Sequence, residues 1–498
     1  MRPSTHRSRV PGTPRHTAGN APGAIWAGQV ELSEPISTIV IDEPGGCDHR
    51  QARLLVRLHR RPIGFVSVDA TDGSIDGEAL WDQIWRDLSD SVLPLLGADR
   101  TSNPAGASVD LPTGECLAAG SIAVTSESQP DLVSVVVCSR DRTETLRGCL
   151  LALQHLEHTN FEVLVVDNAP RTAATAEMFR QHFESDARFR YALEPMAGLA
   201  RARNRGVAEA RGVVVAFTDD DVRVDPWWLQ GIEAGFRRHP RAGCVTGLIP
   251  AAELRTPAQQ YFDQRVGWSA SCETRVYDLG EHRPRSALFP FTAGQFGAGA
   301  NFAFNREYLM ALGGFDEALG AGSPAGGGED LDIFARAVLA GGALVYEPSA
   351  IVWHIHRGEA DELMRQMHNY GQGLTAYLTK HLTSRRSCLR LLSRMPFAVL
   401  HGCAMLRGGR DRPIDGRASA PLGGMVSAEV RGMVRGPFAY YRGRRLVRRS
   451  LPGPSASWGG RTVEVDGAVH SSSQGPVTST VLGGEPSHGV RVAGGHVE

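Results

Sequence analysis

The sequence of 498 residues has almost no lysine, no CxxC pair of cysteines and no long apolar run, and each absence narrows the classes of protein to which the chain can belong. Lys380 is the only lysine, so the positive charge is almost entirely arginine. The 53 basic and 54 acidic residues give a net charge of −1, which supplies no chain-wide field to attract nucleic acid. We therefore expect no nucleic-acid partner.

The eight cysteines are scattered without a CxxC pair, which argues against structural zinc and against a disulfide scaffold. No uninterrupted apolar run reaches the roughly 18 to 20 residues that span a bilayer. Residues 1–27 are basic and rich in proline and glycine but lack the apolar core of a signal peptide, and they predict a disordered leader. We expect a cytoplasmic protein, with any membrane association on the cytoplasmic face.

Residues 28–98 predict a small α+β module. The runs "ISTIVI", "ARLLVRLH" and "IGFVSV" are rich in β-formers, and a helical stretch follows in which Leu80, Ile84 and Leu88 recur every four residues. This pattern indicates no chemistry. Residues 99–131 are rich in Gly, Pro and Ser and predict a linker.

Residues 132–384 alternate near-continuous Val/Leu strands with amphipathic helices. After "LVSVVVCS" comes a helix with Leu146, Cys149, Leu150 and Leu153 on one face, and then the strand "FEVLVVDN". Such a pattern predicts an α/β domain with a mostly parallel sheet buried on both faces. Ligands of such sheets bind beyond the carboxyl ends of the strands.

Residues 385–449 carry fifteen arginines against three acidic residues, with short apolar runs between them. Two interpretations remain open: a basic amphipathic element that binds a membrane surface, and a solvated helical annex that packs on the α/β domain. Residues 450–498 are rich in Gly, Ser and Pro and predict a disordered tail.

Three consecutive carboxylates, Asp219, Asp220 and Asp221, follow the strand "GVVVAF". Like charges at the end of a buried strand repel one another unless a cation lies near them. Oxygen ligands of this kind suit Mg²⁺ or Mn²⁺, which commonly keep one or two protein carboxylates plus substrate phosphates. A solvated acidic turn is the alternative.

Five motifs occur in an order that resembles the inverting glycosyltransferases of family 2, which have the GT-A fold. They are "VSVVVCSRDR", "FEVLVVDNAP", "AGLARARNRG", "FTDDD" and "GGGEDLD", and the resemblance covers roughly residues 132–356. It implies a nucleotide-sugar donor, a divalent metal (Mn²⁺ or Mg²⁺) bound at a DxD motif, and one in-line displacement that inverts the anomeric carbon.

The resemblance assigns donor contacts to seven residues. In the loop after the first strand these are Ser139 and Asp141, and at the end of the second strand Asp167 matches the acid that bonds the nucleobase. This chain has "DNAP" where the family more often has "DDGS". The remaining matches lie in the next helix and in the acidic turn: Gly198, Arg203, Asn204 and Asp219.

Within the acidic turn the resemblance makes Asp221 the metal ligand and Asp219 a ribose or metal contact. The strand "EPSAIVWHIHR" ends with His354 and His356 on one face, and either imidazole can complete a metal site that favours Mn²⁺. We rank His354 ahead of His356. A structural histidine is the alternative.

The base that takes the acceptor proton is expected in "GGGEDLD", at the start of a helix. The resemblance selects Asp330, with Glu329 and Asp332 as alternates whose charges otherwise complement the helix dipole. On the acceptor side the resemblance points to Asn301 and Trp353, whereas Phe302 and Phe304 are interpreted as core.

The sequence therefore predicts an inverting glycosyltransferase that moves a hexosyl or related group to a hydroxyl. The charge and texture of residues 385–449 suggest a glycan or lipid-linked acceptor of the cell envelope. Two alternatives remain: a non-catalytic sugar-nucleotide binding or scaffold protein on the same fold, and a nucleotidyltransferase. The second is disfavoured because "VCSRDRTETL" lacks the glycine-rich phosphate loop of that class.

Overall fold

The computed structural model describes residues 23–41, 49–70, 72–94, 131–385, 387–394 and 424–450. Most of the predicted leader, nearly all of the predicted linker and the predicted tail lie outside these ranges, as does the middle of the basic stretch. Within them, no helix is both long enough and apolar enough to cross a bilayer.

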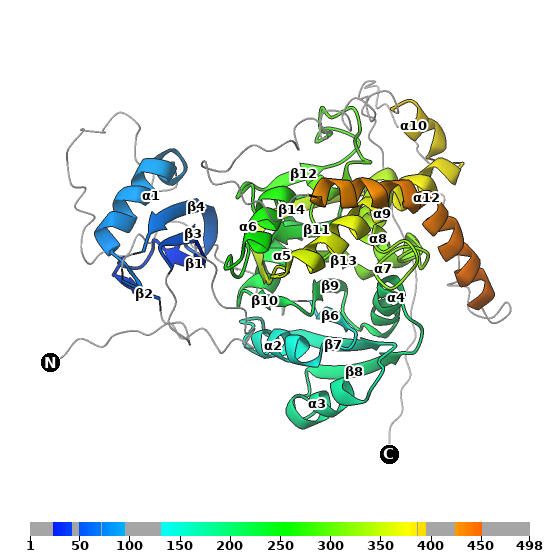
Figure 1. Ribbon diagram of the computed structural model, residues 1–498, viewed down its shortest axis with the longest axis horizontal. Coiled ribbons are helices and arrows are strands. Elements are labelled where there is room, and N and C mark those ends of the chain that lie inside the picture. The colour runs from blue at the N-terminus through cyan, green and yellow to red at the C-terminus, as the bar shows by residue number, and fades with distance from the viewer. Residues whose placement is uncertain are drawn as a thin grey trace, which may run out of the picture. The chain divides into compact units, whose positions relative to one another are not determined.

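The core of the α/β domain is a nine-stranded mixed sheet (Figure 1). Its hydrogen-bonded order is β10-β14-β11-β13-β9-β6-β7-β8, with β12 paired to β14. Six strands share one direction, which confirms the predicted mostly parallel sheet. The strands are β6 (Val133–Ser139), β7 (Phe161–Asn168), β8 (Phe189–Glu194), β9 (Val214–Asp219), β10 (Val222–Val224), β11 (Ala242–Leu248), β12 (Arg275–Tyr277), β13 (Asn301–Asn305) and β14 (Ala343–His354).

Alternate residues of β6 enter two separate cores, because successive side chains of a strand point to opposite faces. Val135 and Val137 pack under α2 (Thr143–Gln154), α3 (Ala174–His182) and α5 (Trp228–Arg237). Val136 packs under helices on the other face. Those helices are α4 (Leu199–Glu209), α7 (Arg306–Ala311), α8 (Glu329–Leu339), α9 (Ala360–Thr383) and α10 (Cys388–Leu392). Both faces of the sheet are therefore buried under helices, as predicted. Phe302 and Phe304 are core residues with 0% exposure.

The N-terminal module begins earlier than its composition suggests. Its sheet has the order β1-β3-β4, and α1 (Gly77–Val92) buries Leu80 and Ile84 as predicted. The strands are β1 (Ile25–Glu31), β2 (Ile39–Val40), β3 (Gln51–Leu58), β4 (Arg61–Asp69) and β5 (Ser74–Ile75). The sequence analysis missed β1, which pairs in parallel with β3, and overrated "ISTIVI", of which only Ile39–Val40 is a strand. The alternation in β1 is weak because only one of its residues is buried.

Buried contacts attach the module to the α/β domain. Arg57 donates to Asp225 Oδ2 at 2.6 Å, with both side chains at most 6% exposed. Leu55 packs with Leu248 and Ile351 in a small apolar cluster. A buried ion pair needs both partners, since removal of one leaves the other charge uncompensated. The attachment of the module therefore depends on both Arg57 and Asp225.

Helix α12 (Met425–Ser450) packs on α9 through glycines, and the two helices lie side by side in Figure 1. A Cβ on Gly432 would stand 2.0 Å from the carbonyl oxygen of His368, and a Cβ on Gly371 would stand 2.0 Å from that of Glu429. The Thr375 hydroxyl donates across the interface to the Met433 carbonyl at 2.8 Å. Part of the basic stretch is thus a helical annex packed on the α/β domain.

The Gly432→Ala variant tests this close packing. We expect a loss of about 1 to 3 kcal/mol in the free energy of unfolding, because the added methyl group must displace backbone atoms. Alanine is intrinsically the better helix former by about 1 kcal/mol, so a stabilised variant would contradict the packing. The control is Val434→Ala on the exposed side of α12, which should change stability by less than about 0.5 kcal/mol in denaturant titrations.

Candidate active site

Strands β6, β7, β9 and β14 end at the same edge of the sheet and bring the predicted polar residues together. Ser139 ends β6, Asp167 lies at the end of β7, Asp219 ends β9 and His354 ends β14. The four strands run in one direction, so their carboxyl ends define one edge. Ligands of open α/β sheets bind at this edge.

Pairing of β10 with β14 explains why the acidic turn meets the histidine. Val222 lies opposite His354 in the antiparallel register, so the preceding Asp221 lies beside the end of β14. His354 Nε2 is 3.4 Å from Asp221 Oδ1. Asp219, Asp221 and His354 can each offer one ligand atom, and these atoms lie within 4.8 Å of one another. Two carboxylate oxygens and one imidazole nitrogen are a donor set that fits Mn²⁺.

The three carboxylates have different electrostatic surroundings. Desolvation raises the pKa of Asp219 to about 7 against the opposing charge of Arg203, and it raises the pKa of Asp220 to about 6 against that of Arg142. Burial also acts on Asp221, but His354, Arg142 and Arg357 outweigh it and lower its pKa to about 2. Burial lowers the pKa of His354 to about 4. Near pH 7, Asp221 is ionised and His354 is neutral, which are the states that bind a metal.

Arg203 links the acidic turn to the start of α8. Its guanidinium is 2% exposed, donates to Glu329 at 3.0 Å and lies 3.4 Å from Asp219 Oδ1. It also donates to the Gly299 carbonyl at 2.8 Å. Because it is buried between two acids, Arg203 holds β9 and α8 at a constant separation.

The three candidate bases differ in accessibility. Glu329 is 5% exposed and bound to Arg203, and burial with the neighbouring Asp330 raises its pKa to about 7. Asp332 has no exposed surface and pairs with Arg336, Lys380 and His381. Asp330 is the partly exposed member, and its Oδ2 accepts from the Gly299 N–H at 3.0 Å. Of the three, Asp330 is the carboxylate that a substrate can reach.

Asp167 is buried at the end of β7 with one oxygen still free to accept. Its Oδ2 accepts from the Tyr191 hydroxyl at 2.8 Å, whereas its buried Oδ1 has no hydrogen-bond partner among the described residues. Desolvation raises the pKa of this carboxyl group. An unpaired buried acceptor is costly unless a ligand N–H or O–H satisfies it.

The other predicted donor contacts have mixed surroundings. The Ser139 hydroxyl donates to Asp220 at 2.7 Å, and Asp141 accepts from the Arg171 N–H at 2.8 Å. Gly198 has a φ of 144°, which favours glycine, and caps α4. Asn204 bonds both backbone groups of Phe315, so it braces that loop instead of facing the edge of the sheet.

The structure locates both predicted acceptor residues elsewhere. Asn301 is fully buried, accepts from the Trp228 indole and donates to the carbonyls of Leu248 and Ala350. These bonds leave none of its amide atoms for an acceptor. Trp353 packs in the apolar cluster that includes Leu55 of the N-terminal module. Neither role was visible in sequence because both depend on contacts between distant strands.

Sequence reasoning missed three residues beside the acidic turn. Arg142 pairs with both Asp220 and Asp221, and Arg357 lies 3.5 Å from Asp221 Oδ2. The sequence feature that could have found them is an arginine shortly after β6 and another shortly after β14, two of the strands that end at the site. Tyr370 is 37% exposed, and desolvation of its hydroxyl group together with the carboxylates of Asp330, Asp219 and Asp221 raises its pKa. Tyr370 comes from α9, which no local motif connects to the site.

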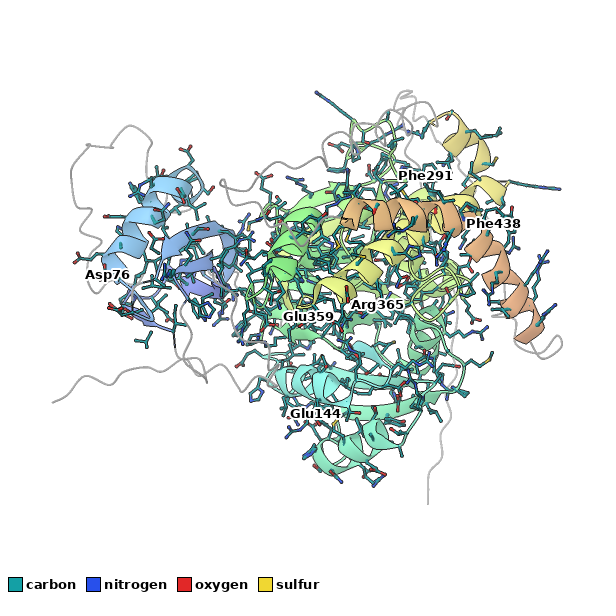
Figure 2. The ribbon with its side chains drawn as sticks, in the orientation of Figure 1. Asp76, Glu144, Phe291, Glu359, Arg365 and Phe438 are labelled. Carbon is teal, nitrogen blue, oxygen red and sulfur yellow. The ribbon has the colours of Figure 1, made fainter. Side chains whose placement is uncertain are left out.

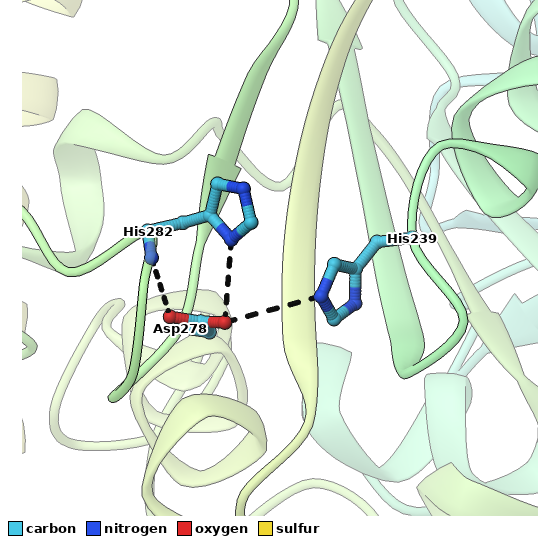
Figure 3. Close-up of side chains that lie close together, drawn as sticks. All are labelled: His239, Asp278 and His282. Carbon is cyan, nitrogen blue, oxygen red and sulfur yellow. Dashed lines mark hydrogen bonds and ion pairs between the residues drawn. The ribbon is translucent and has the colours of Figure 1, made fainter.

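A second group of potential ligands, His239, Asp278 and His282, lies near the opposite ends of β11 and β14 (Figure 3). Asp278 Oδ1 already accepts from the N–H groups of Gly280 and His282, and Arg241 lies 3.3 Å from Oδ2. An arginine therefore already compensates the carboxylate. The group is explained as an ion-pair network that closes the loop after β12.

The geometry agrees with comparisons to known proteins. Residues 134–313 match the family model described as Glycosyl transferase family 2. This segment is a family 2 glycosyltransferase domain. The match includes the acidic turn and ends before Asp330 and His354, which the fold brings to the same edge. The resemblance predicted from five motifs is thereby confirmed.

Curated relatives match parts of this chain. Polypeptide N-acetylgalactosaminyltransferase 11 of Xenopus tropicalis is 32% identical over 163 residues, which are 32% of this chain and 26% of that protein. The pre-mycofactocin glycosyltransferase of Mycobacterium tuberculosis is 25% identical over 250 residues. That alignment covers 50% of this chain and 48% of the relative. The chain therefore spans about half or less of the length of these relatives.

Among solved structures, a mannosyltransferase from Pyrobaculum calidifontis in complex with GDP-Man and Mn²⁺ is 16% identical. The alignment covers 61% of this chain and 87% of that one, with a TM-score of 0.41.

The buried network of Asp332 gives a prediction about stability. Burial opposes ionisation, but Arg336, Lys380 and His381 outweigh it and hold the pKa of Asp332 well below 3.8. In Asp332→Asn we expect a loss of about 3 to 5 kcal/mol in unfolding free energy, because the fully buried carboxylate that pairs with Arg336, Lys380 and His381 is lost. The control is Asp361→Asn on the exposed start of α9, which should have little effect.

The same network sets the sign of a pH effect. Because the folded pKa of Asp332 is depressed, its contribution to stability is complete above the unfolded value of 3.8 and is lost as the pH falls below it. Urea titrations from pH 7 to pH 3 should therefore show a smaller decline for Asp332→Asn than for wild type. Equal declines would exclude Asp332 as the source.

Proposed function

We propose that this chain is a metal-dependent, inverting glycosyltransferase that moves a sugar from a nucleotide-diphosphate donor to a hydroxyl group. The observation that supports this most is the convergence of two separate acidic groups on one edge of a family 2 domain. Asp219, Asp221 and His354 form one group, and Asp330 belongs to the other, across Arg203. One group suits the leaving diphosphate and the other suits the nucleophile.

The nucleobase of the donor binds at Asp167, whose Oδ1 can accept from a nucleobase N–H. Asp219, Asp221 and His354 would hold Mn²⁺ or Mg²⁺. When bound, the metal neutralises charge on the diphosphate. Arg142 and Arg357 lie beside the same carboxylates and add positive charge near the leaving group. The two arginines balance the negative charge of Asp221, which would otherwise repel the phosphates of a nucleotide.

Asp330 acts as the general base. It accepts the proton of the acceptor hydroxyl as that oxygen forms a bond to the anomeric carbon. The bond from the anomeric carbon to the phosphate oxygen breaks, and its electron pair leaves with the nucleoside diphosphate. Attack from the face opposite the leaving group inverts the anomeric carbon. The bond from the Gly299 N–H to Asp330 Oδ2 orients the carboxylate for this transfer.

Paired variants separate donor binding from catalysis. We expect Asp330→Asn to keep metal-dependent donor binding and to lose about 10²- to 10⁴-fold in turnover, because its amide cannot take a proton. We expect Asp221→Ala to lose the dependence of donor binding on Mn²⁺. Donor binding is measured by thermal shift with UDP- and GDP-sugars, with and without Mn²⁺, since a ligand of the native state raises the melting temperature.

Turnover is measured as release of nucleoside diphosphate, with and without a panel of glycan and lipid-linked acceptors. The matched control is Asp361→Asn, an exposed carboxylate on α9, which should behave as wild type. If wild type and both site variants bind donor and none turns it over, the chain is a sugar-nucleotide binding protein and the enzymatic proposal fails.

The acceptor is proposed to be a cell-envelope or lipid-linked glycan, met at an anionic membrane surface. Support comes from the side of α12 that faces away from α9. Val434 and Phe438 are 68% and 78% exposed there, and Phe438 is labelled in Figure 2. The same side carries six exposed arginines: Arg431, Arg435, Arg442, Arg445, Arg448 and Arg449. Exposed apolar side chains surrounded by arginines suit binding at the headgroup region of an anionic bilayer.

Vesicle sedimentation tests the membrane contact. We expect the full chain to bind vesicles that contain anionic phospholipid and not purely zwitterionic ones, with weaker binding at high salt. Each arginine near the surface contributes about 1 kcal/mol. Phe438→Ser should bind more weakly, whereas Glu144→Gln on α2 should not change binding. Absence of sedimentation with anionic vesicles would remove the membrane proposal and leave glycosyl transfer standing.

A further inference from the structure

His354 and His356 form a buried pair at the end of β14. Their Nδ1 atoms lie 3.1 Å apart, and the two side chains are 8% and 1% exposed. The rings of Phe262 and Trp268 pack against them edge to face. The pair therefore lies between aromatic walls, and each imidazole has its second ring nitrogen directed at a carboxylate.

The two carboxylates lie at opposite ends of the pair. His354 Nε2 is 3.4 Å from Asp221 Oδ1 in the proposed metal site. His356 Nε2 is buried without a closer hydrogen-bond partner in the described ranges, and Asp263 Oδ1 on α6 (Pro257–Val266) lies 3.6 Å from it. Asp263 is in turn paired with the Arg53 guanidinium from strand β3 of the N-terminal module. A continuous line of charged and polar groups thus runs from the module to Asp221.

Metal ligation by His354 would fix where the protons of the pair lie. A ligating nitrogen carries no hydrogen, so with a metal at Nε2 His354 has its N–H at Nδ1 and donates to Nδ1 of His356. The hydrogen of His356 then lies at Nε2, the nitrogen that faces the Asp263 carboxylate. His354 Nε2 is left with a bare lone pair directed at an oxygen of Asp221. Two acceptors 3.4 Å apart repel each other unless a cation lies between them.

We propose that Arg53 is a positioning residue for the active site: it keeps Asp263 charged and in place, which sets the tautomer of His356 and presents His354 Nε2 to the metal. The proposal rests on the proposed metal role of Asp221 and His354. Outer partners that orient a ligating histidine commonly change metal affinity 10- to 100-fold when they are removed. The N-terminal module is on this view part of the metal site, although it supplies no ligand.

The interface offers a matched control in Arg57. Arg57 lies on the same strand as Arg53 and makes a more deeply buried ion pair with the catalytic domain, to Asp225. Within the described ranges Asp225 forms no hydrogen bond or ion pair with either histidine, and its other oxygen accepts from the Trp227 N–H. If Arg53 acted only by holding the module in place, loss of Arg57 would have at least the same effect on the histidines.

The experiment measures Mn²⁺ binding to the full chain by electron paramagnetic resonance of free Mn²⁺. We expect Arg53→Gln and Asp263→Asn to weaken binding about 10- to 100-fold, and Arg57→Gln to bind as wild type. Arg53→Lys keeps the charge and should restore much of the affinity. Circular dichroism and thermal melts establish that each variant is folded, and Asp263→Asn carries the test if Arg53→Gln does not fold.

A second readout follows the protons directly. In ¹⁵N-histidine-labelled protein with diamagnetic Mg²⁺ at saturation, long-range ¹H–¹⁵N correlations should show His356 protonated at Nε2 and His354 at Nδ1, with assignments from His354→Gln and His356→Gln. We expect Arg53→Gln to lose this single pattern and Arg57→Gln to keep it.

Unchanged tautomers and unchanged Mn²⁺ affinity in Arg53→Gln would overturn the proposal, as would equal losses in Arg57→Gln. If Asp221→Ala binds Mn²⁺ as tightly as wild type, the proposed metal site itself fails, and the tautomer spectra alone then decide whether Arg53 controls the pair.

Discussion

The repulsion among Asp219, Asp220 and Asp221 is the constraint on which the site depends. Three adjacent carboxylates at the end of a buried strand are tolerated only where positive charge is fixed around them. Arg142 and Arg357 face two of them, and Arg203 faces the third. Each arginine also ties the turn to another element, since the loop after β6, the segment after β14 and helix α4 supply one apiece. The arginines that balance the charge of the acidic turn therefore also join it to the neighbouring elements of the domain.

This constraint separates the roles of neighbouring acids. In both acidic motifs one carboxylate is committed to internal cations: Asp220 to Arg142, and Asp332 to Arg336 and Lys380. Their neighbours Asp221 and Asp330 keep atoms at the carboxyl edge of the sheet. A motif read as a run of equivalent acids is thus a mixture of groups with different partners, and burial separates Asp330 from Asp332.

Much of the catalytic domain could be predicted from sequence because its signals are local. The Val-rich strands and the helix with Leu146 and Leu150 follow from periodicity alone, and Asp221 with His354 follows from motifs at strand ends. Asn301 and Trp353 could not be predicted, because their surroundings come from strands far apart in the chain. Strand β1 was missed for a related reason: its partner β3 stabilises it, whereas its own pattern is weak. The role of Asp330 stays a prediction that the geometry favours over Glu329 and Asp332.

Helix α9 touches two parts of the molecule through bare backbone. On one side its Gly371 meets α12, and on the other its Gly373 lies against Gly327 and Gly328, the turn that leads into Asp330. With no side chains between them, these three segments have a fixed spacing set by backbone atoms. Their sequences consequently cannot drift independently: inserting one residue into α12 would rotate its later residues by about 100° and take its glycines out of register. Length changes in this part of the chain should therefore be confined to the loops, even among relatives that differ widely in sequence.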